Sequence, residues 1–273
     1  MRFKSENEAI RADKKLIISF SANDTKVVHT LQETFKVLFD NNRNPIDVAK
    51  IKRLVTGFSE SYDKVLKKII ENSITLDLET FKFNVATVLP SFKMTRKGVF
   101  HGLKIEKGSI VDPNKVLDAC WIQTGKELLD LRNRLNQHTS NPRSRAILEL
   151  SPEQRKGVVA KASELFDKLE WTTVKGGDIG PVGASKILFA VLPEIALPVD
   201  RDEWKYVFRT HSYDKVLSIM INEISEWEKQ SNTHLETLDS HLPTTLISVY
   251  NVMAMEARKR ARQTLERVGI SAC

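Results

Sequence analysis

Cysteine is scarce in this chain of 273 residues, which contains only Cys120 and Cys273. Two cysteines, neither of them in a CxxC pair, cannot build a disulfide framework or hold a zinc ion or an iron–sulfur cluster by thiolates alone. Cys120 lies beside Trp121 in an apolar stretch, which predicts a packed core thiol. We therefore expect no iron–sulfur cluster.

Long apolar runs are also missing, since no stretch approaches the roughly 18 residues that cross a bilayer. The N-terminus is charged and lacks the apolar segment of a secretory signal. We therefore expect a cytoplasmic protein without a membrane partner.

Metal and nucleotide motifs are absent as well. None of the six histidines is spaced as a metal ligand with another histidine or a cysteine, and there is no HExxH, Walker loop, GxSxG or GxGxxG. We therefore expect neither a metal nor another cofactor.

Positive charge is in excess, with a net charge of +7 and an isoelectric point near 9.3. Such a balance favours an anionic partner without saying anything about the fold. The composition, 41% hydrophobic and 28% charged, is that of a globular protein.

Apolar residues recur at intervals of three and four along most of the chain, which predicts a mostly α fold. Helices are expected within 23–90, after Asp112-Pro113, from Ser151-Pro152-Glu153, and through the last 25 or so residues. Residues 97–105 alternate between polar and apolar and fit either a small hairpin or an irregular loop. An arginine-rich break at 132–156 predicts two helical regions, 1–140 and 150–273, that form two lobes.

The most informative segment runs from Gly176 to Leu188 and contains Gly176, Gly177, Gly180 and Gly183. A glycine-rich turn that leads directly into a helix leaves unpaired backbone N–H groups at the positive end of the helix dipole. A DNA phosphate suits such a site, and main-chain contacts of this type position DNA without reading its sequence.

This segment resembles the helix-hairpin-helix DNA glycosylases of base excision repair, the endonuclease III and oxoguanine glycosylase group. That family carries a Leu-Pro-Gly-Val-Gly-like hairpin, a helix, and then an apolar segment that ends in a catalytic aspartate. Residues 179–183 (Ile-Gly-Pro-Val-Gly) are similar to the hairpin, with Pro181 in place of its first glycine. Residues 198–200 (Pro-Val-Asp) are similar to the second element, and Trp204-Lys205-Tyr206-Val207-Phe208-Arg209 to the helix start that follows it. About 40 residues share the resemblance.

The resemblance implies double-stranded DNA as the partner and a cleft between the lobes as its binding site. It makes Asp200 the catalytic carboxylate, which would stabilise the positive charge on the sugar as the glycosidic bond breaks. Ser185 replaces the lysine of the bifunctional members, so we expect a monofunctional enzyme, with Lys186, one place later, as a further catalytic candidate. The substrate would be a damaged or modified base, in repair or in defence against modified phage DNA.

Two further groups of residues follow from the same expectation. The DNA-binding candidates are Gly180, Val182, Gly183, Ala184, Ser185, Arg201 and Arg209. The aromatic candidates for a base pocket are Trp204 and Trp171. Arginines in 132–155 and in 258–267 are expected to add to DNA affinity, although those of 258–267 also fit a solvated face of the last helix.

Other interpretations remain open. Asp200 followed by Arg201, Asp202 and Glu203 is typical of a helix N-cap, and capping is compatible with catalysis. The glycine segment fits an ordinary turn, Lys186 a solvated lysine, and the two tryptophans core anchors. A non-enzymatic helical DNA-binding protein is one alternative function. A magnesium-dependent nuclease of the restriction type is another, since Glu203-Trp204-Lys205 matches ExK with Asp178 upstream.

Overall fold

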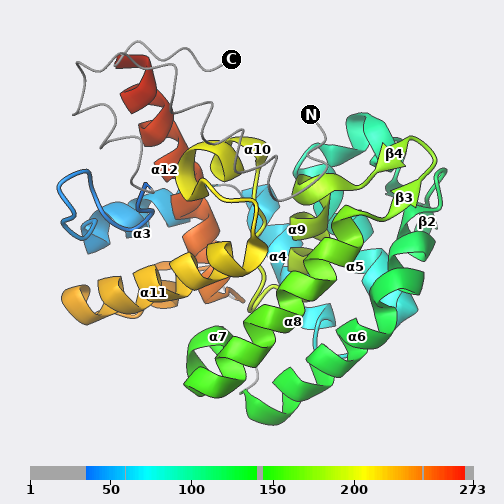
Figure 1. Ribbon diagram of the computed structural model, residues 1–273, viewed down its shortest axis with the longest axis horizontal. Helices are drawn as coiled ribbons and strands as arrows, with labels where there is room; N and C mark the ends of the chain where they lie inside the picture. The colour runs from blue at the N-terminus through cyan, green and yellow to red at the C-terminus, as the bar shows by residue number, and fades with distance from the viewer. Residues whose placement is uncertain (1–34, 59, 140–143, 242, 268–273) are drawn as a thin grey trace, which may run out of the picture.

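The structure, a computed structural model, describes residues 35–58, 60–139, 144–241 and 243–267. These residues are mostly helical, so the prediction of a mostly α fold is confirmed (Figure 1). The first part of the helical stretch expected from residue 23 lies outside the described residues, as does Cys273. The long helices are α3 (Val48–Thr56), α4 (Glu60–Asn72), α5 (Leu78–Ser91), α6 (Val116–His138), α8 (Pro152–Glu170), α9 (Gly180–Val191), α11 (Tyr213–Ser231) and α12 (Leu246–Arg267).

Shorter elements connect them. Two antiparallel pairs of strands occur in the described residues, β1 (Lys104–Glu106) with β2 (Ser109–Val111), and β3 (Thr173–Val174) with β4 (Gly177–Asp178). The segment 97–105 therefore combines a 3-10 turn with the first strand of a hairpin. The short helical elements are η1 (Met94–Arg96), η2 (Gly98–Phe100), α7 (Ala146–Glu149), α10 (Arg201–Glu203), the π-helical turn η3 (Trp204–Phe208) and η4 (Leu235–Leu238).

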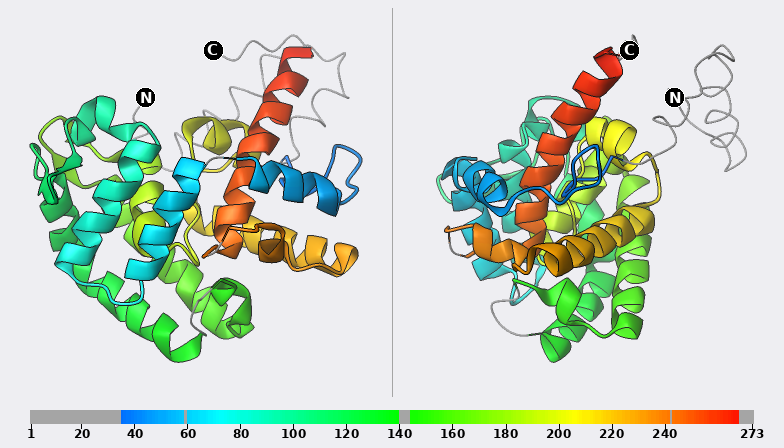
Figure 2. Two further views of the ribbon diagram at one scale, coloured as in Figure 1. Left: turned by 180° about the vertical axis from the view of Figure 1, so that it is seen from behind. Right: turned by 90° about the vertical axis from the view of Figure 1, so that its left-hand side faces the viewer.

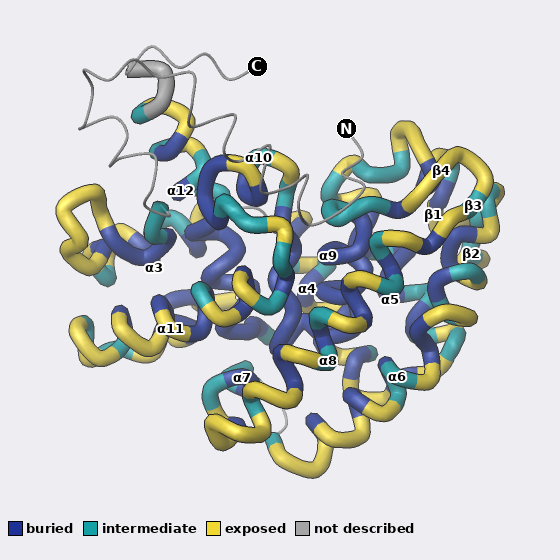
Figure 3. The backbone as a smooth tube through the Cα atoms, in the orientation of Figure 1, coloured by how far each residue is buried: buried dark blue, intermediate teal, exposed yellow. Residues whose placement is uncertain are grey.

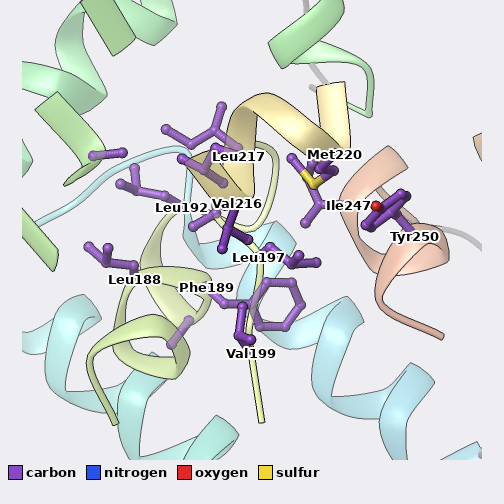
Figure 4. Packing of buried hydrophobic residues seen from close by; sticks show 14 of the residues in the cluster. Leu188, Phe189, Leu192, Leu197, Val199, Val216, Leu217, Met220, Ile247 and Tyr250 are labelled. Atoms are coloured by element: carbon purple, nitrogen blue, oxygen red, sulfur yellow. The ribbon is translucent and has the colours of Figure 1, made fainter. Parts of the chain in front are cut away.

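Helix α9 is central to the packing. It lies between α5 and α8 and is buried from Gly183 to Val191 (Figure 3). The strands, α5 and α6 lie at one end of the molecule, and α3, α11 and α12 lie at the other (Figures 1 and 2). Helices α5 and α6 pack on α9 and α8, and α3 packs on α12, so contacts join the regions before 140 and after 150. One hydrophobic core, shown in part in Figure 4, runs through both.

Local sequence accounts for the helix starts. The Ser151 side chain accepts from the backbone N–H of Gln154 while the Gln154 side chain accepts from that of Ser151, with Pro152 at the first helical position. This capping box confirms the helix start predicted there.

Cys120 is buried and unpaired, as expected for a core thiol, and burial raises its pKa well above the usual range. No helix in the described part of the chain has the length and apolar character to cross a membrane.

The break predicted to begin at residue 132 is wrong, because α6 continues to His138. Arg132 lies inside the protein, where its guanidinium pairs with Glu194 and donates to the carbonyl of Val191, the last residue of α9. Arg145 pairs with two glutamates, and Arg155 donates to two backbone carbonyls at 3.0 Å. These three arginines are therefore bound within the fold, contrary to the expectation of a solvated arginine-rich break.

The arginines of α12 are likewise not a simple solvated face. Arg260 is half-buried and donates to the carbonyls of Lys36, Val37 and Phe39, at 3.3, 2.9 and 2.9 Å. Glu223 of α11 accepts the backbone N–H of Leu38 at 2.6 Å. We call residues 36–39 the N-terminal strap. Its three apolar side chains are fully buried, so the strap joins α11 to α12.

Candidate active site around Asp200

Asp200 follows a buried loop, residues 192–199, that is hydrogen-bonded on several sides. The Ser185 hydroxyl accepts the backbone N–H of Val199 at 3.0 Å, and the Tyr213 hydroxyl donates to the carbonyl of Leu197 at 3.0 Å. The Thr245 hydroxyl donates to the carbonyl of Pro193 at 2.9 Å. Figure 4 shows the side chains of Leu192, Leu197 and Val199 packed into the core. Asp200 therefore extends from a rigid segment at the N-terminus of α10.

Both oxygens of the Asp200 carboxylate are paired with cations. Oδ1 contacts the ammonium of Lys186 on α9, and Oδ2 lies 3.0 Å from Nη1 of Arg258 on α12. The Asp200 and Arg258 side chains are 30% and 28% exposed, whereas that of Lys186 is only 2% exposed. Asp200 is thus held in place by the buried Lys186 and remains partly accessible to solvent. We call Lys186, Asp200, Glu203 and Arg258 the Asp200 cluster.

Glu203 is the buried member of this cluster. Its Oε2 accepts the backbone N–H of Asp200 at 2.8 Å, and its Oε1 lies 3.8 Å from Nη1 of Arg258 with no hydrogen-bond partner among the described residues. Burial, together with the nearby charge of Asp200, raises the pKa of Glu203 to about 7. Asp200 therefore does occupy an N-cap position, as the capping interpretation predicts, and the cap contact is made through Glu203.

Phe92 completes the surroundings of Lys186. The ammonium lies 4.4 Å from the centroid of the Phe92 ring, a cation–π distance. Phe92 is half-buried at the end of α5, and its ring meets that of Tyr62 edge-on with centroids 6.4 Å apart. A buried ammonium held by a carboxylate and an aromatic face is well placed to position Asp200. It is badly placed to attack a substrate, because it has almost no access to solvent.

The predicted hairpin residues form the first turns of α9. The chain reverses earlier, at Gly176 and Gly177, whose φ angles of 104° and 120° favour glycine. Gly180 begins the helix with φ 73°, and Gly183 has no room for a side chain, since a Cβ there would lie 2.7 Å from Cγ2 of Ile179.

The predicted DNA-binding residues differ in accessibility. Gly180 and Val182 are partly exposed, whereas Gly183, Ala184 and Ser185 are buried. Arg201 is exposed beside Asp200, and Arg209 is half-buried with a left-handed backbone, φ 53°. Burial lowers the pKa of Arg209.

The two tryptophans have opposite environments. Trp204 is 6% exposed and packs against the stacked rings of Phe166 and Tyr213, whose centroids lie 5.6 and 6.3 Å from its own. Its place is that of a core anchor, and a base could stack on it only after a rearrangement. Trp171 is 64% exposed at the end of α8, next to the β3–β4 turn.

The residues of the nuclease interpretation do not share a sheet. Glu203 lies in α10 and Lys205 in the π-helical turn, while Asp178 is exposed on β4 and accepts from the Thr173 hydroxyl at 2.7 Å. Within the described ranges, no three histidine, cysteine or carboxylate groups are grouped to hold a metal ion.

A pocket of about 180 Å³ lies elsewhere, between α6 and α8, and none of its lining residues belongs to the Asp200 cluster. The residues that line the pocket include no carboxylate, so the Asp200 cluster is the stronger candidate for an active site.

Comparison with known protein families, with curated proteins and with solved structures finds no match to this chain.

Sequence reasoning missed two members of the site. Arg258 was expected to add to DNA affinity or to lie on a solvated face, and it pairs with Asp200, 58 residues away in sequence. Phe92 was not predicted as a site residue, because nothing near it in sequence indicates a site. Its only signal is proximity in space to Lys186.

Proposed function

We propose that this protein is a monofunctional DNA glycosylase that hydrolyses the N-glycosidic bond of a damaged or modified base. The observation that carries the proposal is Asp200 itself, a partly exposed carboxylate fixed by Lys186 and Arg258 at the end of a rigid apolar loop. The unit formed by α8, the β3–β4 turn and α9 supports it, since α9 offers backbone N–H groups to a DNA phosphate.

The chemistry fits a fixed carboxylate. As the C1′–N bond breaks, its electron pair leaves with the base, which takes a proton from water, and the hydroxyl of that water adds to C1′. Positive charge builds on the sugar, and a negative charge held beside it lowers the barrier. Because Lys186 and Arg258 already hold Asp200, little reorganisation is needed when that charge develops.

The burial of Lys186 supports hydrolysis without a covalent lysine adduct. An amine must lose its proton and reach C1′ to form a Schiff base. Lys186 is paired with Asp200 and is 2% exposed, so both conditions are unfavourable. We expect an intact abasic site as product and no adduct trapped by borohydride.

The test is the Asp200→Asn variant, incubated with a panel of duplexes that carry modified bases and then treated with alkali to reveal abasic sites. Loss of a positioned charge should lower the rate by at least about a hundredfold, or about 3 kcal/mol. Asp202→Asn is the matched control, because it removes the same charge two residues away and should keep the wild-type rate. Equal rates for wild type and Asp200→Asn would refute the proposal.

A second candidate is a DNA-binding protein without catalysis. It is favoured by the pairing of both Asp200 oxygens, which is also what a purely structural ion-pair cluster would show. This alternative predicts DNA binding by wild type and by Asp200→Asn, with base release by neither.

A further inference from the structure

The loop between α5 and β1 carries three cations in five residues, Lys93, Arg96 and Lys97. All three are exposed, and none pairs with a carboxylate of the described residues. Residues 91–105 contain no acidic residue. The other cations described above are mostly paired with carboxylates, as in the case of Arg132, Arg145, Arg258 and Lys186.

The backbone of this loop is fixed. Gly102 N–H donates to the carbonyl of Thr95 at 3.2 Å, and the Asn114 side chain donates to the carbonyl of Val99 at 2.8 Å. The Phe100 ring packs so closely under α9 that a Cβ on Gly183 would lie 3.0 Å from it. Because the backbone is already fixed, binding an anion has to order only the side chains and not the loop itself.

The loop also lies beside both parts of the proposed DNA site. It begins next to Phe92, whose ring contacts Lys186 of the Asp200 cluster. Its other end lies against the β3–β4 turn, because η2 packs on β4 and a Cβ added to Gly176 would lie 3.7 Å from Cα of Val99. Lys175, exposed at that turn, adds a further unpaired cation.

We propose that Lys93, Arg96 and Lys97 bind successive phosphates of a DNA duplex, on the same face as the N-terminus of α9. The argument is charge complementarity together with position, since the three exposed cations lie on a loop that packs beside the glycine-rich start of α9 and carry the charge opposite to that of phosphates. The inference rests on the proposed function only in taking DNA as the partner. It requires no catalysis.

The test compares two triple variants with equal loss of charge. K93Q/R96Q/K97Q removes the loop cations, and K50Q/K52Q/R53Q removes three exposed cations from α3, at the other end of the molecule (Figure 1). Binding to a short labelled duplex without damage is measured by fluorescence anisotropy at several salt concentrations. A plot of log K against log salt falls with a slope of about −0.9 for each phosphate contact, so each lost contact makes the plot less steep by about 0.9.

We expect the loop variant to bind at least tenfold more weakly at physiological salt. The magnitude of its slope should fall by about 2 to 3, whereas that of the α3 variant should fall by less than about 1. Equal effects of the two variants would show a response to net charge alone and overturn the inference, as would a wild-type protein that does not bind the duplex. Base release is measured separately. A loop variant with weakened binding, combined with no base release by wild type, would uphold this inference and refute the glycosylase.

Discussion

Arg132→Leu should destabilise the protein more than any single substitution on its surface. Arg132 and Glu194 are 1% and 2% exposed, and they join α6 to the loop that precedes Asp200. Removing the arginine takes from the buried Glu194 carboxylate the guanidinium with which it pairs, and frees the last carbonyl of α9. Breaking a buried ion pair in this way costs about 3 to 5 kcal/mol. For a chain of this size, that corresponds to a fall in Tm of roughly 6 to 20 °C.

The same structure predicts the reverse for the double variant. In R132L/E194L neither charge of this pair remains, and two apolar side chains of broadly comparable volume occupy the space. Replacement of a buried pair by hydrophobic residues is often neutral or stabilising, so the double variant should recover most of the loss. Urea unfolding of wild type, both single variants and the double variant at pH 7 gives the coupling energy directly.

Two results would contradict this reasoning. An R132L protein as stable as wild type would show that water or another cation compensates Glu194. A double variant less stable than R132L would show that packing, and not charge, dominates at this position.

Two further substitutions test other parts of the core. Glu203→Gln should raise the free energy of unfolding by an amount that grows from pH 5 to pH 8. Burial raises the pKa of Glu203 from 4.5 to about 7 in the folded state. Between these two values the unfolded state ionises more readily, so the folded wild type loses stability as the pH rises. The gain should reach about 3 kcal/mol above pH 7, and a pH-independent gain in thermal denaturation would contradict the assignment. Gly183→Ala should cost about 1 to 3 kcal/mol through overpacking against Ile179. Gly157→Ala on α8, where a Cβ meets nothing within 4 Å, should instead be neutral or stabilising, and equal effects of the two would argue against the packing explanation.

The sequence predicted what is decided locally. The start of α8 follows from Ser151, Pro152 and Gln154, which satisfy each other within one turn. The approximate place of Asp200, at the end of an apolar run and before a short helix, could also be predicted, since both features are contiguous in the chain.

Pairings across the fold could not be predicted. Arg132 looked like the first residue of a solvated break, because a charge at that position is exposed unless a partner is supplied. That partner, Glu194, lies 62 residues away. In the same way, the aromatic and cationic neighbours of the site come from α5 and α12, and no local periodicity indicates which of the many arginines reaches Asp200.

The N-terminal strap has a consequence for how the chain folds. Its backbone is bound by Glu223 and Arg260, which lie 185 and more than 220 residues further along. Contacts this distant in sequence can form only after most of the chain is in place, and long-range closure slows folding more than it changes stability. Helix α12 presents Arg260 to the strap and Arg258, two residues earlier, to Asp200. Helix α12 therefore completes the N-terminal strap and the Asp200 cluster together, and during synthesis neither can assemble before Arg258 and Arg260 have been made.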